Sequence, residues 1–192
     1  MKAVGIFGGT FDPIHNGHLL TALSVKEARD LDKIIFMPAF ISPHKTEKQH
    51  SDPVHRLEMV KLAVKGVSYF DVSDYEINKK DVSYTIDTIK ELKKSYSSIE
   101  LIIGYDNLLV FDTWKDPGQI FNMAKVIVLK RGSDDAKKRN KYFDKAIFAE
   151  TPVIEISSTA VRERVKNNLP IDFFVTGKVK EYIYKHNLYK EV

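Results

Sequence analysis

The stretch Gly5-Ile6-Phe7-Gly8-Gly9-Thr10-Phe11-Asp12-Pro13-Ile14-His15-Asn16-Gly17-His18-Leu19 decides the fold. It starts as an apolar strand, turns at two glycines, and enters a helix that Asn16 is positioned to cap. Glycine lets the backbone approach a ligand closely, and free amides at a helix start favour anions. His15 and His18 share one helix face. Their imidazoles and the Thr10 hydroxyl can all donate hydrogen bonds. The stretch therefore predicts a phosphate-binding turn.

Two other interpretations of this turn remain open on the residues alone. It is also typical of a plain strand-to-helix connection with two surface histidines, and His15 and His18 with Asp12 as a third ligand would suit a metal. A Walker A loop is excluded, because no Lys-Ser or Lys-Thr pair follows the glycines at the required offset.

On either side of this turn, apolar runs of strand length alternate with segments in which the apolar residues recur with the period of a helix. Strands are predicted at residues 2–7, 32–37, 70–72, 99–103, 126–129 and 153–156. Helices are predicted after Asn16, after Ser51 or Asp52, and at residues 83–96, 159–167 and 172–186. This alternation indicates an α/β fold, a doubly wound parallel sheet in a single domain over residues 1–192. Ligands of such sheets bind at the carboxyl ends of the strands, where the polar and glycine-rich residues fall.

Composition narrows the function classes. The 192 residues include no cysteine, which excludes a disulfide scaffold, a Cys-ligated zinc site and a thiol nucleophile. No signal peptide or membrane span is recognisable, so we expect a cytoplasmic protein. The net charge of +4 suggests nucleic acid only weakly, because Asp residues interrupt the densest basic cluster, at residues 137–141. Phosphate-bearing small substrates explain the charge better.

A second candidate phosphate site is Ile156-Ser157-Ser158-Thr159-Ala160-Val161-Arg162. A strand leads into a hydroxyl cluster and then a helix that Ser158 or Thr159 is expected to cap. Hydroxyls, helix amides and Arg162 together suit the tail of a triphosphate, although an ordinary capped helix would show the same pattern. Trp114, the only tryptophan, is either a core residue or a partly exposed platform for a flat ring.

Gly8-Gly9-Thr10-Phe11-Asp12-Pro13-x-His15-x-Gly17-His18 resembles the signature of the HxGH nucleotidyltransferases, and residues 156–162 resemble that superfamily's ISSTxxR motif. The resemblance implies a Rossmann-like fold and transfer of a nucleotidyl group from a nucleoside triphosphate to a phosphate-bearing acceptor. The closing helices, at about 158–187, would then cover the ATP site. Mg²⁺ would be carried with ATP, with no protein metal site.

The segments Ser42-Pro43-His44-Lys45, Ser83-Tyr84-Thr85, Gly104-Tyr105-Asp106-Asn107 and Asp112-Thr113-Trp114 look like the bacterial nicotinate-mononucleotide adenylyltransferase family. The resemblance implies that the catalytic residues are His15, His18, Lys45 and Arg162. It implies ATP binding by Gly8, Gly9, Thr10, Phe11, His15, His18, Gly104, Asp106, Ile156, Ser157, Ser158, Thr159 and Arg162. The acceptor, nicotinate mononucleotide, would meet His44, Lys45, Tyr84, Thr85, Leu108 and Trp114.

This chain departs from the family pattern at Tyr105 and Asn107, and Tyr105 is expected to reshape the adenine side. Rival hypotheses are a related enzyme that uses nicotinamide mononucleotide or phosphopantetheine, and a nucleotide sensor without catalysis. No nucleic-acid or membrane partner is expected, and a homo-oligomer is left open.

Overall fold

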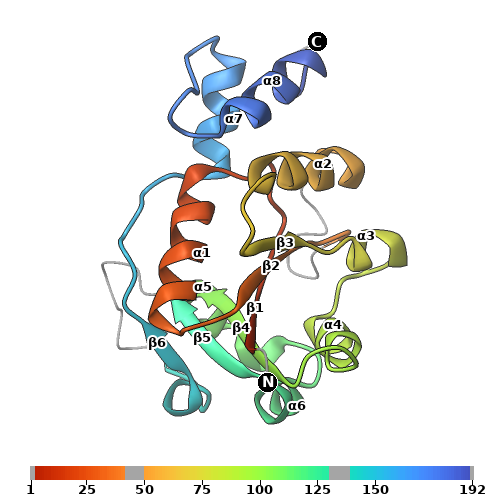
Figure 1. The fold of residues 1–192 in the computed structure, drawn as a ribbon, viewed down its shortest axis with the longest axis vertical. Helices are drawn as coiled ribbons and strands as arrows, with labels where there is room; N and C mark the ends of the chain where they lie inside the picture. The colour runs from red at the N-terminus through yellow and green to blue at the C-terminus, as the bar shows by residue number, and fades with distance from the viewer. Residues whose placement is uncertain (1–2, 42–49, 130–138, 191–192) are drawn as a thin grey trace.

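The computed structural model describes residues 3–41, 50–129 and 139–190 (Figure 1). These residues form a six-stranded sheet in the order β3-β2-β1-β4-β5-β6, with every neighbouring pair parallel. The predicted doubly wound parallel α/β fold is confirmed. The strands are β1 (Ala3–Gly9), β2 (Lys33–Pro38), β3 (Phe70–Val72), β4 (Ser98–Gly104), β5 (Lys125–Leu129) and β6 (Ile147–Ala149).

Helices cover both faces of this sheet, as expected for parallel strands that are apolar along their whole length. They are α1 (Asn16–Ala28), α2 (Pro53–Val64), α3 (Tyr75–Lys79), α4 (Thr85–Leu92), α5 (Tyr105–Leu109), α6 (Pro117–Met123), α7 (Ser158–Lys166) and α8 (Gly177–Lys185). The described residues also form the short 3₁₀ helices η1 (Phe111–Thr113) and η3 (Phe143–Lys145).

Alternation along β1 divides the core into two parts. Phe7 packs with the cluster that holds buried residues of α1, α2, α7 and α8. Its neighbour Ile6 packs with the opposite cluster, which holds residues of α4, α5 and α6. Successive strand residues point to opposite faces, so one buried strand supports both layers of helices.

The predicted strand at residues 153–156 is wrong. These residues form an extended connection that runs from β6 to α7 (Figure 1) and belongs to no strand. Val153 is 58% exposed, so the apolar run lacks a sheet neighbour to bury it. The sixth strand is the three-residue β6, which pairs with β5 at the edge of the sheet.

Other boundaries also shift. Pro38 does not end the second strand early but is its last residue, in register with Gly9 of β1. Residues 83–96 hold the shorter helix α4, and residues 172–186 hold α8, which begins at Gly177 after a Thr176 cap. Of the two predicted caps, Ser51 and Asp52, it is Asp52 that caps α2, with Pro53 at its first turn as predicted.

The strand order changes direction between β1 and β4, because β2 and β3 lie on one side of β1 and β5 and β6 lie beyond β4. Ligands of open α/β sheets bind at the carboxyl edge beside such a point. The loop after β1 and the residues after Gly104 lie there. No helix among the described residues is long and apolar enough to span a membrane.

Gly5 tests how tightly the centre of the sheet is packed. A Cβ on Gly5 would lie 2.5 Å from Ile34 Cδ1, and 3.0 Å from both Ile102 Cδ1 and Leu31 Cδ1. We expect Gly5→Ala to lower the free energy of unfolding by about 1–3 kcal/mol through overpacking. Gly8→Ala in the same strand is the control, since a Cβ there meets nothing within 4 Å. Thermal and urea unfolding of both variants measure the difference, and equal stabilities would contradict it.

Candidate active site

His15 and His18 cap the start of α1 reciprocally. The His18 amide donates to His15 Nδ1 at 3.3 Å, and the His15 amide donates to His18 Nδ1 at 3.2 Å. The two rings stack with their centroids 3.6 Å apart. The N-cap is therefore His15, and the prediction that Asn16 caps this helix is wrong. The Asn16 side chain instead donates to the Phe173 carbonyl.

These two bonds fix the protonation state of the histidines. A ring nitrogen that accepts from a backbone amide carries no proton, so the neutral ring must carry its proton on Nε2. Burial lowers the pKa of His15 from 6.5 to about 4, which keeps the ring neutral at pH 7. Each imidazole then offers one Nε2–H donor, and His15 contributes no positive charge. His15 is therefore a neutral hydrogen-bond donor and not a cation.

Neighbouring residues fit this arrangement closely. A Cβ at Gly17 would lie 3.0 Å from His15 Nδ1, so any larger residue would press on the His15 ring where it folds back over the helix start. The Phe11 ring meets His18 edge-on at 5.0 Å and is 3% exposed. Phe11 therefore supports His18 with its side chain. Its contact with ATP stays a prediction.

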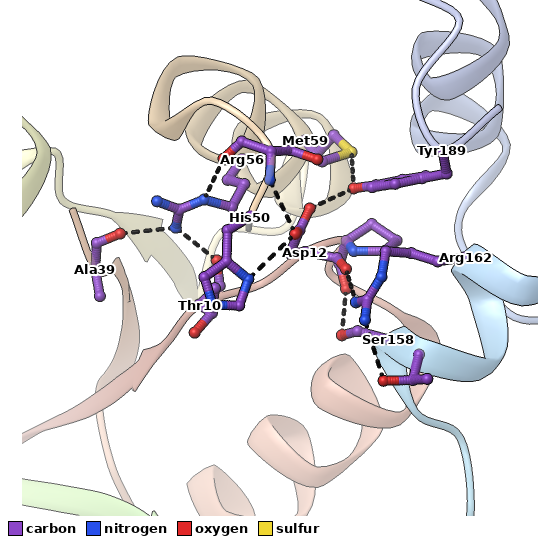
Figure 2. A network of polar contacts seen from close by, with 12 residues as sticks. Thr10, Asp12, Ala39, His50, Arg56, Met59, Ser158, Arg162 and Tyr189 are labelled. Atoms are coloured by element: carbon purple, nitrogen blue, oxygen red, sulfur yellow. Dashed lines mark hydrogen bonds and ion pairs between the residues drawn. The ribbon is translucent and has the colours of Figure 1, made fainter. Parts of the chain in front are cut away.

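Helix α7 packs onto the loop after β1, although the two are far apart in sequence (Figure 2). Ser158 Oγ donates to the Pro13 carbonyl at 2.9 Å, and Arg162 Nη1 donates to the Asp12 carbonyl at 2.7 Å. Arg162 Nη2 also donates to Thr159 Oγ1 at 3.2 Å. The N-cap of α7 is Ser157, not Ser158 or Thr159, because Ser157 Oγ accepts from the Ala160 amide. The two predicted phosphate motifs therefore form one surface.

Asp12 joins this loop to two further segments. Its Oδ1 accepts from the Tyr189 hydroxyl at 2.7 Å, and its Oδ2 accepts from the Ser51 amide at 3.1 Å (Figure 2). Burial raises the pKa of the Asp12 carboxyl, but the hydrogen bonds from Tyr189 and Ser51 outweigh it and the net pKa is lowered. Burial and the adjacent Asp12 charge raise the pKa of Tyr189. Asp12 is therefore ionised and Tyr189 is its donor.

The predicted acceptor-ring residues gather at the start of α4. Tyr84 precedes Thr85, the first residue of α4, and no side chain caps that helix start. The Lys115 ammonium lies 4.5 Å from the centre of the Tyr84 ring and 3.5 Å from Asp87 Oδ2. Trp114, beside it in the chain, is half-buried and stacks on Phe111 with ring centroids 4.7 Å apart. Trp114 thus combines the two predicted roles of core contact and partly accessible ring.

The remaining predicted residues fall in three places. Gly104 ends β4 and Asp106 is exposed in the first turn of α5, at the carboxyl edge of the sheet. Leu108 is fully buried, backbone and side chain alike, so its predicted contact with the acceptor has no exposed surface in this structure and stays a prediction. Tyr105 packs edge-on against Phe143 in the core, and the expectation that it reshapes the adenine side stays a prediction. His44 and Lys45 lie outside the described residues.

Comparison with known proteins agrees with this geometry. The profile of the Cytidylyltransferase-like family matches residues 6–164. A Clostridium beijerinckii protein named "Probable nicotinate-nucleotide adenylyltransferase" is 43% identical over 204 residues, covering 99% of this chain and 100% of that one. Its namesake in Clostridium perfringens strain 13 is 40% identical over 200 residues, 99% of each chain. This chain belongs to the nicotinate-nucleotide adenylyltransferase family.

Solved structures show the same fold. The Plasmodium falciparum nicotinic acid mononucleotide adenylyltransferase complexed with NaAD has a TM-score of 0.80 at 21% identity, over 98% of each chain. A Vibrio parahaemolyticus crystal structure described as a nicotinate-nucleotide adenylyltransferase has a TM-score of 0.70 at 20% identity, covering 100% of this chain and 98% of that one.

Three residues of this adenylyltransferase fold stand at the site but were missed by sequence reasoning: Arg56, Tyr189 and Lys115. Arg56 lies on the apolar face of α2 with Met59 and Val60, and that position was the one available signal that its side chain is buried. Tyr189 and Lys115 carry no comparable local signal, because their partners are 177 and 28 residues away in the chain.

The hydrogen bonds to Nδ1 of His15 and His18 predict that the proton of each ring is on Nε2. Nitrogen-15 NMR of the imidazoles should find His15 and His18 with the proton on Nε2, and His15 neutral down to pH 5, because burial lowers its pKa to about 4. A protonated His15 at pH 6 would contradict the capping geometry.

The lowered pKa of His15 makes the free energy of unfolding depend on pH. The unfolded chain binds the proton at the ordinary His15 pKa of 6.5 and the folded chain at about 4, so this contribution is full above pH 6.5 and is lost as the pH falls toward 4. His15→Asn, which keeps a capping acceptor but does not titrate, should lose less stability over this range. Urea unfolding between pH 7 and 4 measures the difference.

Proposed function

We propose that this protein transfers the adenylyl group of ATP to nicotinate mononucleotide, forming nicotinate adenine dinucleotide and pyrophosphate in NAD biosynthesis. The observation that carries the proposal is the docking of α7 onto the loop after β1, through Arg162 to Asp12 and Ser158 to Pro13. This contact joins two anion-binding helix starts, those of α1 and α7, at the carboxyl edge of the sheet. The names of the relatives supply the acceptor.

The chemistry needs positioning more than proton transfer. A phosphate oxygen of the acceptor forms a bond to the α-phosphorus of ATP, and the bond from that phosphorus to the bridging oxygen of pyrophosphate breaks. The attacking phosphate is already an anion at pH 7, so no strong base is required. The cost lies in bringing anions together and in the charge on the transferring group.

Each predicted residue then has a place in this reaction. The Nε2–H donors of His18 and His15 serve the α-phosphate and the phosphate beside it, as neutral hydrogen-bond donors. Thr10 holds the bridging region, and Lys45 holds the acceptor phosphate. Ser158, Thr159 and Arg162 hold the leaving pyrophosphate. A guanidinium has five N–H donors, and the bonds to Asp12 and Thr159 use two of them.

Mg²⁺ enters as part of the substrate, MgATP. Among residues 3–41, 50–129 and 139–190, no group of three or more metal-ligating side chains gathers into a cation site. Both Asp12 oxygens accept hydrogen bonds from protein groups, and phosphate oxygens and water are ligands that Mg²⁺ commonly takes. The cytoplasmic location, a homo-oligomer and closure of the ATP site by the C-terminal helices stay predictions.

The decisive experiment measures pyrophosphate release from MgATP with nicotinate mononucleotide, nicotinamide mononucleotide or phosphopantetheine as acceptor. We expect the highest kcat/KM with nicotinate mononucleotide. Preference for another acceptor would reassign the substrate, and no release with any acceptor would favour the nucleotide sensor.

Within that assay, His18→Ala should lower kcat by about 10² or more, equivalent to about 2.7 kcal/mol, because it removes a donor to the transferring phosphate. The fold should persist, as circular dichroism can check. His186→Ala is the control, since its exposed ring lies beside Tyr182. Near-normal turnover of the His18 variant would remove His18 from the catalytic residues.

Charge beside Tyr84 supports the choice of the nicotinate ring. Lys79 Nζ lies 2.8 Å from Asp87 Oδ2 and Lys115 Nζ lies 3.5 Å from it, so two cations share one carboxylate. The start of α4 adds amide donors without a side-chain cap. A ring that carries a carboxylate gains from the Lys115 ammonium over the Tyr84 ring and from these amides, whereas a neutral amide ring does not.

Lys115→Met should therefore lower kcat/KM for nicotinate mononucleotide about two- to fivefold, equivalent to about 0.5–1 kcal/mol, and leave that for nicotinamide mononucleotide nearly unchanged. Lys79→Met is the matched control, because Lys79 pairs with the same Asp87 carboxylate but is not the cation over the Tyr84 ring. Equal losses with both acceptors would show that Lys115 does not act on ring charge.

A further inference from the structure

Arg56 is a fully buried arginine in α2, only 1% exposed, and its guanidinium binds backbone carbonyls (Figure 2). Nη1 donates to the Thr10 carbonyl at 2.8 Å and to the Ala39 carbonyl at 2.7 Å. Nη2 donates to the Phe40 carbonyl at 3.0 Å, and Nε donates to the Ser51 carbonyl at 3.0 Å. One side chain thus holds the loop after β1, the end of β2 and the residue before the α2 cap.

Arg56 carries a buried charge, which is unusual for a side chain that only fills space in the core. Burial lowers the pKa of Arg56, and the charge of Asp12 opposes that effect. Among the residues that the structure describes, Arg56 forms no ion pair, and its direct contacts are backbone carbonyl oxygens. A buried charge without a carboxylate against it is costly, and an apolar side chain would fill the space more cheaply. The guanidinium is therefore suited to holding several carbonyls in fixed directions.

The carbonyls belong to the two halves of the proposed reaction. Thr10 lies in the nucleotide-side loop. On the other side, the Phe40 amide donates to Ser83 Oγ at 3.0 Å, and the Ser83 amide donates to the Ile41 carbonyl at 2.9 Å. Ser83 directly precedes Tyr84, where the acceptor-ring residues begin. A continuous series of hydrogen bonds therefore runs from the nucleotide-side loop through Arg56 to the acceptor side.

We propose that Arg56 is a positioning residue that sets the spacing between the nucleotide-side loop at Thr10 and the acceptor-side backbone at Phe40 and Ser83. The inference rests on the proposed function, because it assigns Arg56 to the alignment of two bound substrates. Arg56 touches neither substrate and acts through the backbone it holds. In-line transfer is sensitive to such alignment, and a misplacement of about 1 Å costs about 10²-fold in rate.

The test compares Arg56→Lys with Arg29→Lys. A lysine keeps the charge but lacks the planar fork that reaches carbonyls in several directions. Arg29 is the matched control, because it makes a bidentate ion pair with buried Glu100, at 2.8 and 3.0 Å, away from the carbonyls that Arg56 holds. Calorimetry measures the Kd of a non-hydrolysable ATP analogue and of nicotinate mononucleotide separately, and the pyrophosphate assay measures kcat, at a temperature where unfolding curves show all proteins folded.

Arg56→Lys should lower kcat at least tenfold, equivalent to about 1.4 kcal/mol, while each binary Kd changes less than about threefold. Arg29→Lys should leave kcat and both Kd values near wild type. Unchanged kcat in Arg56→Lys, or losses of kcat that Arg29→Lys reproduces, would overturn the inference. Parallel weakening of both Kd values would overturn it as well, because it indicates damage to each half-site and not to their alignment.

If Arg56→Lys does not fold, Ser83→Ala decides. It removes the hydrogen bond from the Phe40 amide, together with the one that the Ser83 hydroxyl makes to the Glu76 carboxyl. It should lower kcat severalfold with the Kd of the ATP analogue unchanged, and an unchanged kcat would overturn the inference. Wild-type activity separates the two proposals. An inactive wild type refutes the proposed function and this inference with it, whereas an active wild type with an unaffected Arg56→Lys variant refutes only this inference.

Discussion

Hydrogen bonds from distant parts of the chain converge on residues 10–16, the loop that follows the central strand β1. Arg56 reaches it from α2, Arg162 from α7 and Tyr189 from beyond α8 (Figure 2). The Phe174 carbonyl accepts from the Asn16 amide at 2.7 Å, which brings the segment between α7 and α8 to the same loop. A parallel sheet leaves the ends of its strands with backbone groups that need partners. Here those partners are the elements that build the site, so completing the fold and forming the site are one process.

The capping of α1 by two histidines connects this constraint to chemistry. A serine or aspartate at the cap would satisfy the same amide, but only an imidazole has a second nitrogen that is then obliged to donate. Because the Nδ1 atoms of His15 and His18 both accept backbone protons, their Nε2 atoms carry donors. Gly17 is required by the same contact, since any Cβ there would press on the His15 ring. The spacing of the signature is thus explained by the closure of one helix start.

Much of the fold was predictable because its signals are local. The segment Phe70–Val72 is short, yet it forms the predicted strand, which pairs with β2, and Asp52 with Pro53 marks the start of α2. Residues 153–156 failed because their apolar content resembles a strand, whereas strand formation needs a neighbour and β6 already occupies the edge of the sheet. The motif residues of the candidate site could be proposed from resemblance, but the caps of α1 and α7 could not be predicted. Serine, threonine and asparagine are the usual capping residues, and in α1 a histidine takes that position.

Asp12 shows what only the three-dimensional contacts reveal. A carboxylate inside a loop proposed to bind a triphosphate would repel its ligand if it faced that ligand. Its oxygens are instead directed at the Tyr189 hydroxyl and the Ser51 amide, and its backbone carbonyl meets Arg162 (Figure 2). Those hydrogen bonds keep its pKa low despite burial, so the charge is permanent at neutral pH. A permanent anion is a poor general base, because a base must take up a proton near the working pH. Asp12 is therefore best understood as the fixed anion that holds the C-terminal segment and Arg162 against the nucleotide-side loop.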